Sequence, residues 1–311
     1  MEIVNVTHPL KNNQIPGSDI VLIMGFFDGV HRGHQKVIQR GVDLARQKGL
    51  KSVLLTFDRS PREIYQHEEN YKYISTMERK AELVEELGVD YLYFVEFTSE
   101  FASLPPQEFV DDYMVKMRTK YIVAGFDYTY GKKDIANMET LPSFAKGRFE
   151  VITVPEQMIN DEKIGSSTIK KLILNDRVDY ANELLGYSYQ NQGTVVHGLQ
   201  RGRTLGYPTA NVVTSKSQLK PSIGVYVTRI EIDGKWYPSM TSVGYNVTFK
   251  EDTGVTIECN IFDFDEDIYG KDVRVEWLHY LRGEVKFSDA DGLVKQLHKD
   301  KEDSLNYFKK H

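Results

Sequence analysis

The stretch MGFFDGVHRGH, residues 24–34, decides the fold of the first half of the chain. It follows an apolar run, Ile20 to Ile23, that is typical of a buried strand. It precedes His34 to Lys48, where apolar residues recur at helical spacing. A strand-to-helix turn presents free backbone N–H groups and the positive end of the helix dipole, and both favour an anion. The pattern therefore predicts a phosphate-binding turn at residues 24–34.

The glycines and histidines of this turn have distinct expected roles. Gly25, Gly29 and Gly33 allow the close approach or positive φ that such a turn requires. His31 and His34 are three residues apart, so both can reach one phosphate from the start of the helix. Two solvated histidines at a helix N-terminus, or a metal-binding pair, are the alternatives. The spacing resembles the HxGH signature of nucleotidyltransferases, which catalyse attack of an acceptor substrate on the α-phosphate of a nucleoside triphosphate and release pyrophosphate.

Bulk composition limits the class of protein. The 311 residues allow two domains, and 41% hydrophobic with 27% charged residues is ordinary for a globular protein. The net charge of −6 argues against a general nucleic-acid binder. The single cysteine excludes an intramolecular disulfide, and no run approaches the roughly 20 apolar residues of a membrane span. We expect a cytoplasmic enzyme with small-molecule substrates, no nucleic-acid or membrane partner, and a monomeric or weakly homo-oligomeric state.

Strands and helices alternate over the first 155 residues or so. This order predicts a parallel, doubly wound sheet with helices on both faces and ligands at the carboxyl ends of its strands. The candidate site segments, Gly25–His34, Thr56–Pro61 and Gly125–Asp127, all follow expected strands. Beyond the first strand and helix, we expect strands at Ser52–Phe57, Tyr91–Phe97, Tyr121–Ala124 and Phe149–Val154, and helices at Glu78–Leu87 and from Pro105 onward.

A second motif, IGSSTIK, occupies residues 164–170. Ser166, Ser167 and Thr168 begin a helix there, and Lys170 lies half a turn further on. Hydroxyl residues are common helix N-caps and need no function. The functional interpretation places the three hydroxyls at triphosphate oxygens, with Lys170 offsetting their charge.

The periodicity changes in the second half of the chain. A short helix, Asp176–Leu185, ends at Gly186, and Tyr187–Gln192 is interpreted as a linker. Short strands then predict a compact antiparallel barrel, covered by an amphipathic helix from Ser288 onward. The expected strands are Thr194–Val196, Gly224–Ile232, Lys235–Val243, Val255–Phe262 and Asp272–Tyr280. We place the domains at residues 1–186 and 187–311.

The barrel carries a motif of its own, GLQRGRTLGYPTAN, at residues 198–211. Its glycines and arginines suit a loop that folds over phosphates; they are Gly198, Arg201, Gly202 and Arg203. Thr209 and Asn211 offer a hydroxyl and an amide oxygen on one side of an extended segment. Such oxygen ligands suit Mg²⁺ that is bound mainly through a nucleotide's phosphates. A glycine-rich hairpin with a surface turn is the alternative.

In this order and spacing, GFFDGVHRGH, Gly125-Phe126-Asp127, SSTIK and GRTLGYPTAN closely resemble the bifunctional bacterial riboflavin kinase/FMN adenylyltransferase (FAD synthetase) family. The resemblance covers essentially the whole chain. It implies a Rossmann-like nucleotidyltransferase domain that joins FMN and ATP to give FAD and pyrophosphate. It also implies a small antiparallel β-barrel domain with a C-terminal helix, which phosphorylates riboflavin from ATP to give FMN.

The resemblance also implies residue roles, with Mg²⁺ as cofactor and ATP, riboflavin and FMN as substrates. Glu258 matches the kinase base, which would accept the proton of the 5′-hydroxyl. His31, His34 and Asp28 are expected in adenylyl transfer, Asp28 by orienting the loop or substrates. The remaining roles are ATP binding by Gly25, Phe26, Phe27, Gly33, the 166–170 motif and the 198–203 loop; flavin binding by Thr56, Arg59, Asp127, Tyr207 and Pro208; and metal binding by Thr209 and Asn211.

Three segments depart from the family pattern. Ser60 beside Arg59 stands where the family has a histidine, and Lys170 replaces an arginine, which keeps the charge and loses the bidentate fork. The kinase segment at Ser242–Phe249 also differs. A bifunctional enzyme remains the expectation. The alternatives are a riboflavin kinase with a weakened adenylyltransferase domain, or a catalytically silent flavin or nucleotide sensor.

Overall fold

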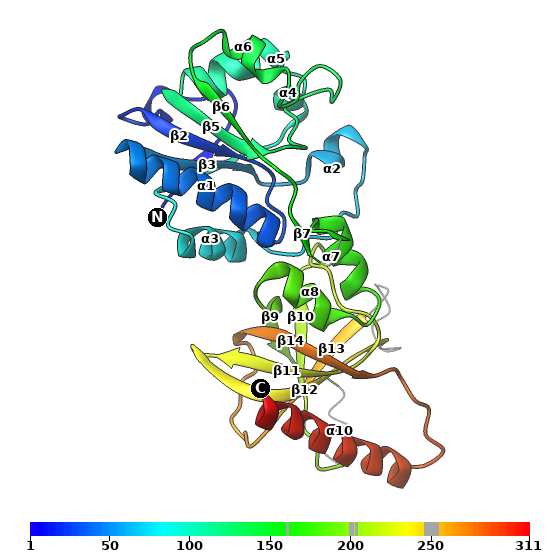
Figure 1. Ribbon diagram of the computed structural model, residues 1–311. Coiled ribbons are helices and arrows are strands. Elements are labelled where there is room, and N and C mark those ends of the chain that lie inside the picture. The colour runs from blue at the N-terminus through cyan, green and yellow to red at the C-terminus, as the bar shows by residue number, and fades with distance from the viewer. Residues whose placement is uncertain (160–161, 199–201, 203–204, 246–254) are drawn as a thin grey trace. The chain divides into compact units, whose positions relative to one another are not determined.

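The computed structural model describes residues 1–159, 162–198, 202, 205–245 and 255–311 (Figure 1). The chain divides into two compact units, Met1–Ser166 and Ser167–His311. None of the helices in the described ranges combines the length and apolarity that crossing a bilayer requires.

The first unit is built on a six-stranded sheet in which every neighbouring pair of strands is parallel. The order of its strands is β1-β4-β3-β2-β5-β6, which confirms the doubly wound sheet expected from the sequence. The strands are β1 (Glu2–Val6), β2 (Ile20–Met24), β3 (Lys51–Phe57), β4 (Tyr91–Val95), β5 (Thr119–Gly125) and β6 (Glu150–Val154).

Helices cover both faces of this sheet (Figure 1). Every residue of β2 is buried, as a central strand requires when both of its faces are covered. The helices are α1 (Arg32–Lys48), α2 (Pro61–Tyr65), α3 (Met77–Glu86), α4 (Ser99–Ala102), α5 (Pro106–Val110) and α6 (Leu141–Ala145), with a π-helical turn (Asp111–Val115) after α5; a two-stranded ribbon, β7 (Met158–Ile159) and β8 (Glu162–Lys163), follows β6.

The strand order determines where this unit can bind a ligand. From β2 the chain continues to β3 on one side of it, and β5 lies on the other side. The carboxyl ends of β2 and β5 therefore form the point at which the strand order reverses, and ligands of open α/β sheets bind at such points. The turn at residues 24–34 joins β2 to α1 at this point.

The second unit is a closed barrel of six antiparallel strands in the order β10-β13-β12-β11-β14-β9. Its strands are β9 (Tyr189–Val196), β10 (Ala210–Thr214), β11 (Gly224–Ile232), β12 (Lys235–Tyr245), β13 (Val255–Ile261) and β14 (Asp272–Arg282). The helix α10 (Ala290–Lys310) contacts β11 and β12. The expected barrel and its C-terminal helix are both confirmed.

The interpretation of Tyr187–Gln192 as a linker is wrong, because β9 already begins at Tyr189. Burial alternates along this strand, with Tyr189 and Asn191 inside the barrel. Asn191 is a polar residue in the core, and its Oδ1 accepts a hydrogen bond from Trp277 Nε1 at 2.9 Å. A buried asparagine hides the alternation of apolar and polar residues by which a strand is recognised in a sequence.

Two helices precede the barrel, α7 (Ser166–Ile173) and α8 (Val178–Leu185). Asn182 of α8 donates from Nδ2 to the Trp277 carbonyl at 2.7 Å, and its Oδ1 accepts from the Tyr189 N–H at 2.7 Å. These bonds join α8 to β14 and β9, so α8 packs as part of the second unit.

One glycine of α1 fits closely against the sheet. A Cβ added at Gly41 would lie 2.3 Å from Cγ1 of Ile23, whose side chain is fully buried. We predict that Gly41→Ala lowers the free energy of unfolding by about 1–3 kcal/mol, because the added methyl overpacks the contact between α1 and β2. Chemical denaturation of Gly41→Ala and of the parent protein, monitored by circular dichroism, measures the change. Gly17→Ala is the control, since nothing lies within 4 Å of its added Cβ. Equal stability of the two variants would contradict the prediction.

Candidate active sites

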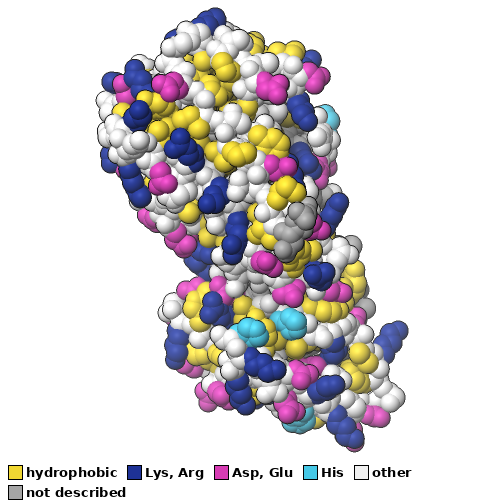
Figure 2. Space-filling model, viewed as in Figure 1, with side chains coloured by type: hydrophobic (Ala, Val, Ile, Leu, Met, Phe, Trp, Pro, Cys, Tyr) yellow, Lys and Arg dark blue, Asp and Glu magenta, His cyan; other side chains and the backbone are white. Residues whose placement is uncertain are grey.

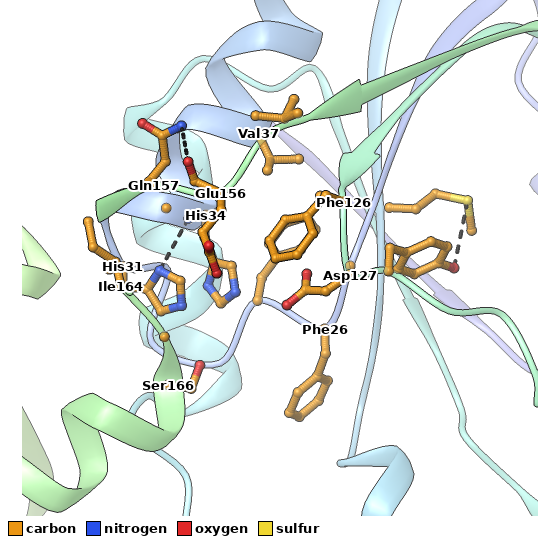
Figure 3. A pocket seen from close by; sticks show the side chains of 18 of the residues that line it. Phe26, His31, His34, Val37, Phe126, Asp127, Glu156, Gln157, Ile164 and Ser166 are labelled. Atoms are coloured by element: carbon orange, nitrogen blue, oxygen red, sulfur yellow. Dashed lines mark hydrogen bonds between the residues drawn. The ribbon is translucent and has the colours of Figure 1, made fainter. Parts of the chain in front are cut away.

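A cavity of about 350 Å³ lies at the carboxyl ends of β2, β3, β5 and β6 (Figure 3). It brings together the three candidate segments that the sequence placed after β2, β3 and β5, and the residues after β6, which the sequence analysis did not single out, also line it. Its lining includes Gly25, Phe26, Phe27, His31, Gly33, His34, Phe57, Pro61, Gly125, Phe126, Asp127, Tyr128, Glu156, Gln157, Lys163 and Ser166.

The two histidines of the turn are in direct contact. Their rings stack with centroids 3.5 Å apart, and His31 Nδ1 accepts a hydrogen bond from the His34 backbone N–H at 3.2 Å (Figure 3). His31 is thus the N-cap of α1. With Nδ1 accepting, the neutral ring of His31 carries its proton on Nε2. The Nε2–H of His31 is therefore a donor that the capping hydrogen bond does not use.

Burial keeps both rings neutral. It lowers the pKa of His31 to about 4, against the opposing charge of Asp28. Burial also lowers the pKa of His34 well below its usual value, and the charges of His31 and Lys80 act in the same direction. His34 Nδ1 is buried and has no hydrogen-bond partner among the described residues. The site therefore offers neutral imidazole groups at neutral pH, which an arriving anion would favour in the protonated form.

Asp28 is buried within the turn and is bonded to the segment that precedes α3. Its Oδ1 accepts from the Ile74 N–H at 2.9 Å, and its Oδ2 accepts from the Tyr71 hydroxyl at 3.1 Å. Its backbone carbonyl accepts from Ser166 Oγ at 2.9 Å. The side chain of Asp28 thereby holds the turn, and its part in adenylyl transfer stays a prediction.

Two hydrogen bonds fix the orientation of the peptide group between Phe26 and Phe27. The buried Thr56 donates from Oγ1 to the Phe26 carbonyl at 2.8 Å, and Lys80 donates from Nζ to the same oxygen at 2.9 Å. Phe27 has φ 55°, in the left-handed region. Lys80 was not among the residues that the sequence indicated, because it lies 54 residues from Phe26 in the chain.

A charged group at the cavity was also missed from the sequence. Lys163 Nζ lies 3.2 Å from Asp127 Oδ2 and 3.1 Å from Glu156 Oε1, and 4.6 Å from the centroid of the Phe126 ring. All four residues line the cavity. Lys163 directly precedes the 164–170 motif, and this position is the signal in the sequence that could have indicated it.

The structure accommodates the departures from the family pattern at Arg59 and Ser60. Ser60 is buried as the N-cap of α2, where its hydroxyl accepts from the Arg62 N–H at 3.3 Å. The Ser60 N–H donates to the Tyr73 hydroxyl at 2.9 Å. Arg59 is exposed and pairs with Asp58 at 3.1 Å. The structure thus gives Ser60 a local role in capping and leaves Arg59 at the surface.

A second, aromatic cavity of about 200 Å³ adjoins the first. The two share Phe57, Pro61, Tyr128 and Thr129. The rest of its lining is rich in aromatic rings, namely Tyr65, Phe97, Phe101, Phe109 and Tyr130. Planar apolar groups stack favourably in such surroundings.

In the second unit, the structure brings Asn211 and Glu258 together. They are direct partners across the β10–β13 pair, and Ser242 of β12 is the partner of Glu258 on its other side. Directly opposed residues have Cβ atoms about 5 Å apart on one face of a sheet. Burial raises the pKa of Glu258, which brings a carboxylate closer to the range of a general base.

The residues before Asn211 lie in different surroundings. Pro208 and Thr209 line a cavity of about 310 Å³ together with Cys259 and Ile261. Tyr207 is buried against α10, where its hydroxyl lies 2.6 Å from His298 Nδ1. The structure therefore separates the tyrosine ring from the Thr209 cavity lining.

The loop before β10 is described in part. Gly198 lies so close to Asn211 that an added Cβ would be 2.2 Å from Asn211 Nδ2, and the Gly202 carbonyl accepts from the Tyr207 N–H at 2.8 Å. Arg201 and Arg203 lie outside the described residues. Ser167, Thr168 and Lys170 belong to α7 in the second unit, and their contact with a nucleotide stays a prediction.

The described side chains suit a hard cation that is held chiefly by its nucleotide. Thr209, Asn211 and Glu258 offer oxygen ligands of the kind that Mg²⁺ prefers. Within the described residues, no group of three or more His, Cys, Asp or Glu side chains could hold a metal ion. A magnesium ion here would therefore depend on phosphate oxygens for most of its ligands.

Comparison with known proteins assigns each unit to a family. Residues 14–168 match the family model for FAD synthetase, and residues 185–308 match that for riboflavin kinase. A crystal structure described as a macrolide-efflux protein from Streptococcus pneumoniae superposes with a TM-score of 0.89 at 40% identity, over 97% of this chain and 99% of that one.

Two curated relatives match along their whole length. The bifunctional riboflavin kinase/FMN adenylyltransferase of Listeria monocytogenes is 42% identical over 311 residues, which is 100% of this chain and 99% of the relative. The protein of the same description from Bacillus subtilis is 38% identical over 99% of this chain and 98% of the relative. The chain therefore belongs to the bifunctional riboflavin kinase/FMN adenylyltransferase family.

Proposed function

We propose that the two reactions of this enzyme take place at two separate sites. Adenylyl transfer from ATP to FMN is assigned to the cavity at β2 and β5, and riboflavin phosphorylation to the surface around Asn211 and Glu258. The stacked, neutral pair of His31 and His34 at the start of α1 carries the first assignment. The cross-strand pairing of Asn211 with Glu258 supports the second.

Adenylyl transfer needs no nucleophile from the protein. An oxygen of the FMN phosphate forms a bond to the α-phosphorus of ATP, the bond between that phosphorus and the bridging oxygen breaks, and pyrophosphate leaves with the bond's electron pair. Catalysis then consists of alignment and stabilisation of charge. We assign this to His31, His34, the N–H groups of Phe26, Phe27 and Gly33, and the Ser166 hydroxyl. The hydroxyls of Ser167 and Thr168 and the cation of Lys170 are proposed for the same task from the sequence motif alone.

The flavin ring is proposed to occupy the aromatic cavity beside the histidines. Its position next to the first cavity would set the FMN phosphate close to the start of α1. Asp127, held by Lys163, and the exposed cation of Arg59 would orient the flavin or its phosphate. Thr56 would act through the Phe26 carbonyl that it binds.

Riboflavin phosphorylation is proposed to use Glu258 as general base. The carboxylate would accept the proton of the 5′-hydroxyl as that oxygen bonds to the γ-phosphorus and ADP leaves. Mg²⁺, when bound, neutralises charge on the phosphates, and Thr209 and Asn211 would hold it. Gly198, Gly202, Arg201 and Arg203 would form the loop over the phosphates, with Tyr207 and Pro208 on the flavin side.

We further propose that the functional boundary lies at residue 186, beside the start of the riboflavin kinase match at residue 185, although α8 packs with the second unit. On the face drawn in Figure 2, basic and acidic side chains are interspersed, which suits small-molecule substrates better than a nucleic acid. A cytoplasmic location, where ATP is supplied, and a monomeric or weakly homo-oligomeric state complete the proposal.

Separate sites predict separable losses. His34→Ala should slow FAD formation from FMN by about 10²–10³-fold, because it removes a donor from the developing charge, and should leave FMN formation from riboflavin unchanged. Glu258→Gln should slow FMN formation by about 10²–10⁴-fold and spare FAD formation. Chromatography of the flavins formed by each variant measures both rates. Equal loss of both activities in either variant would contradict the two-site proposal.

The depressed pKa of His31 predicts a response to phosphate. In the free protein, the histidine ring should stay neutral until the pH falls to about 4. Bound pyrophosphate favours the protonated ring, so it should raise this pKa by at least one unit. Proton–nitrogen NMR of the imidazole, titrated with and without pyrophosphate, measures the shift. An unchanged titration at saturating pyrophosphate would count against a phosphate role for His31.

The same pKa predicts how stability depends on pH. Since the folded pKa lies below the unfolded value of about 6.5, His31 stabilises the fold fully above pH 6.5, and this contribution is lost between pH 6.5 and 4. His31→Gln should therefore unfold with a shallower dependence on pH across this window than the parent protein. If the denaturation midpoints of His31→Gln and of the parent protein changed with pH by the same amount, this expectation would be refuted.

The metal assignment predicts a selective effect of Asn211→Ala. This variant should raise by at least tenfold the Mg²⁺ concentration that gives half-maximal FMN formation, because an oxygen ligand is lost. The Mg²⁺ dependence of FAD formation from FMN should stay as in the parent. Val213→Ala, an exposed change two residues along the same strand, is the matched control. An Asn211→Ala variant with the parent's Mg²⁺ dependence would remove the assignment.

A further inference from the structure

Lys80 is a buried ammonium group directly behind the β2–α1 turn. Its residue is 3% exposed, and its Nζ lies 2.9 Å from the Phe26 carbonyl oxygen and 4.5 Å from the centroid of the Phe26 ring. Among the described residues, it makes no ion pair within 4 Å. A lysine buried without an ion-pair partner is costly, so a lysine at this place calls for a role.

Lys80 keeps much of its charge where it lies. Burial lowers its pKa to about 8, and the negative charges of Asp28 and Asp58 oppose this decrease. At pH 7 the group is therefore mostly protonated. Its charge acts on His34, whose pKa it lowers. The ammonium thus acts both on the backbone of the turn and on a histidine of the cavity.

Two donors fix the orientation of one peptide group. Lys80 Nζ and Thr56 Oγ1 both donate to the Phe26 carbonyl, at 2.9 and 2.8 Å. Because a trans peptide is planar, the N–H of Phe27 points in the direction opposite to that carbonyl. The Phe27 N–H has no hydrogen-bond partner among the described residues. Both Phe26 and Phe27 line the cavity.

The conformation of Phe27 requires such support. Its φ of 55° is in the left-handed region, which costs a residue with a side chain about 1–2 kcal/mol. Backbone strain of this kind persists only where surrounding contacts enforce it, and it gathers at functional sites. The two bonds to the Phe26 carbonyl are contacts of that kind.

We infer that Lys80 is a positioning residue for adenylyl transfer: it holds the Phe26–Phe27 peptide so that the Phe27 N–H faces the phosphate of the bound nucleotide, and it sets a positive charge behind that peptide. This rests on the proposed location of adenylyl transfer in the first cavity. Lys80 does not line the cavity, so it acts through the turn and not by contact with substrate.

The test compares three variants by FAD formation from FMN and ATP. Lys80→Met removes both the donor and the charge, and should lower kcat by about 10²-fold with little change in KM for FMN. Lys80→Gln keeps a donor without the charge and should recover part of this loss. Lys36→Met, an exposed lysine of α1, should match the parent. Riboflavin phosphorylation by the same protein samples is the internal control for folding and should be unchanged in all three.

A second readout separates positioning from a merely structural role. In folded Lys80→Gln, loss of the nearby charge should raise the pKa of His34, measured by NMR of the imidazole. Thr56→Val, which removes the other donor to the Phe26 carbonyl and no charge, should lower kcat while leaving that pKa as in the parent. If Lys80→Met does not fold, Lys80→Gln and Thr56→Val still decide the question.

Two results would overturn the inference. The first is parental kcat for FAD formation in folded Lys80→Met or Lys80→Gln. The second is an equal fall of both activities in Lys80→Gln with His34 titrating as in the parent. His34→Ala, assayed in parallel, shows whether a negative result concerns the role of Lys80 or the proposed location of adenylyl transfer. If His34→Ala loses FAD formation and Lys80→Met does not, the role of Lys80 alone is wrong; if neither loses it, the proposed site is wrong.

Discussion

The buried carboxylate of Asp28 is the interaction on which the first site depends. The turn around it contains Phe27 at φ 55° and Val30 at φ 37°, conformations that residues with side chains seldom adopt. Each costs about 1–2 kcal/mol. The hydrogen bonds of Asp28 to Ile74 and Tyr71, and of Gly29 N–H to Ser75 Oγ, hold the turn in that strained form. The site is therefore shaped before any substrate arrives.

In both units, the backbone sets the positions of the residues that we propose for the two reactions. In the first, the reversal of strand order between β2 and β5 leaves room for a ligand, and the start of α1 supplies N–H groups and histidines there. In the second, the closed barrel fixes the register of β10 against β13, so that Asn211 faces Glu258. A shift of register by one residue would move either side chain to the opposite face of its strand.

Local pattern was sufficient to predict much of this molecule. The alternation of strands and helices predicted the doubly wound sheet of the first unit, and the buried run of β2 with the HxGH spacing predicted a site at the start of α1. The pattern of short strands gave the barrel. Each of these features depends on residues that are close together in the chain, where the spacing of apolar residues and the residue types of turns predict local structure.

The remaining features depend on contacts between distant residues. Lys80 lies on a helix whose apolar spacing is ordinary, and only the fold shows its ammonium under Phe26. Asn191 was assigned to a linker because the partner of its amide, Trp277, is 86 residues away. Only the resemblance indicates Glu258 in the sequence, and its pairing with Asn211 is a result of the fold.

The most direct test of this account is a crystal structure of the protein with a non-hydrolysable ATP analogue. We expect a phosphate oxygen of the analogue within about 3.2 Å of the Phe27 amide nitrogen and of His31 Nε2, with the Phe26 carbonyl still bonded to Lys80. A nucleotide whose phosphates lie away from the β2–α1 turn, with the Phe27 N–H still unliganded, would contradict the account.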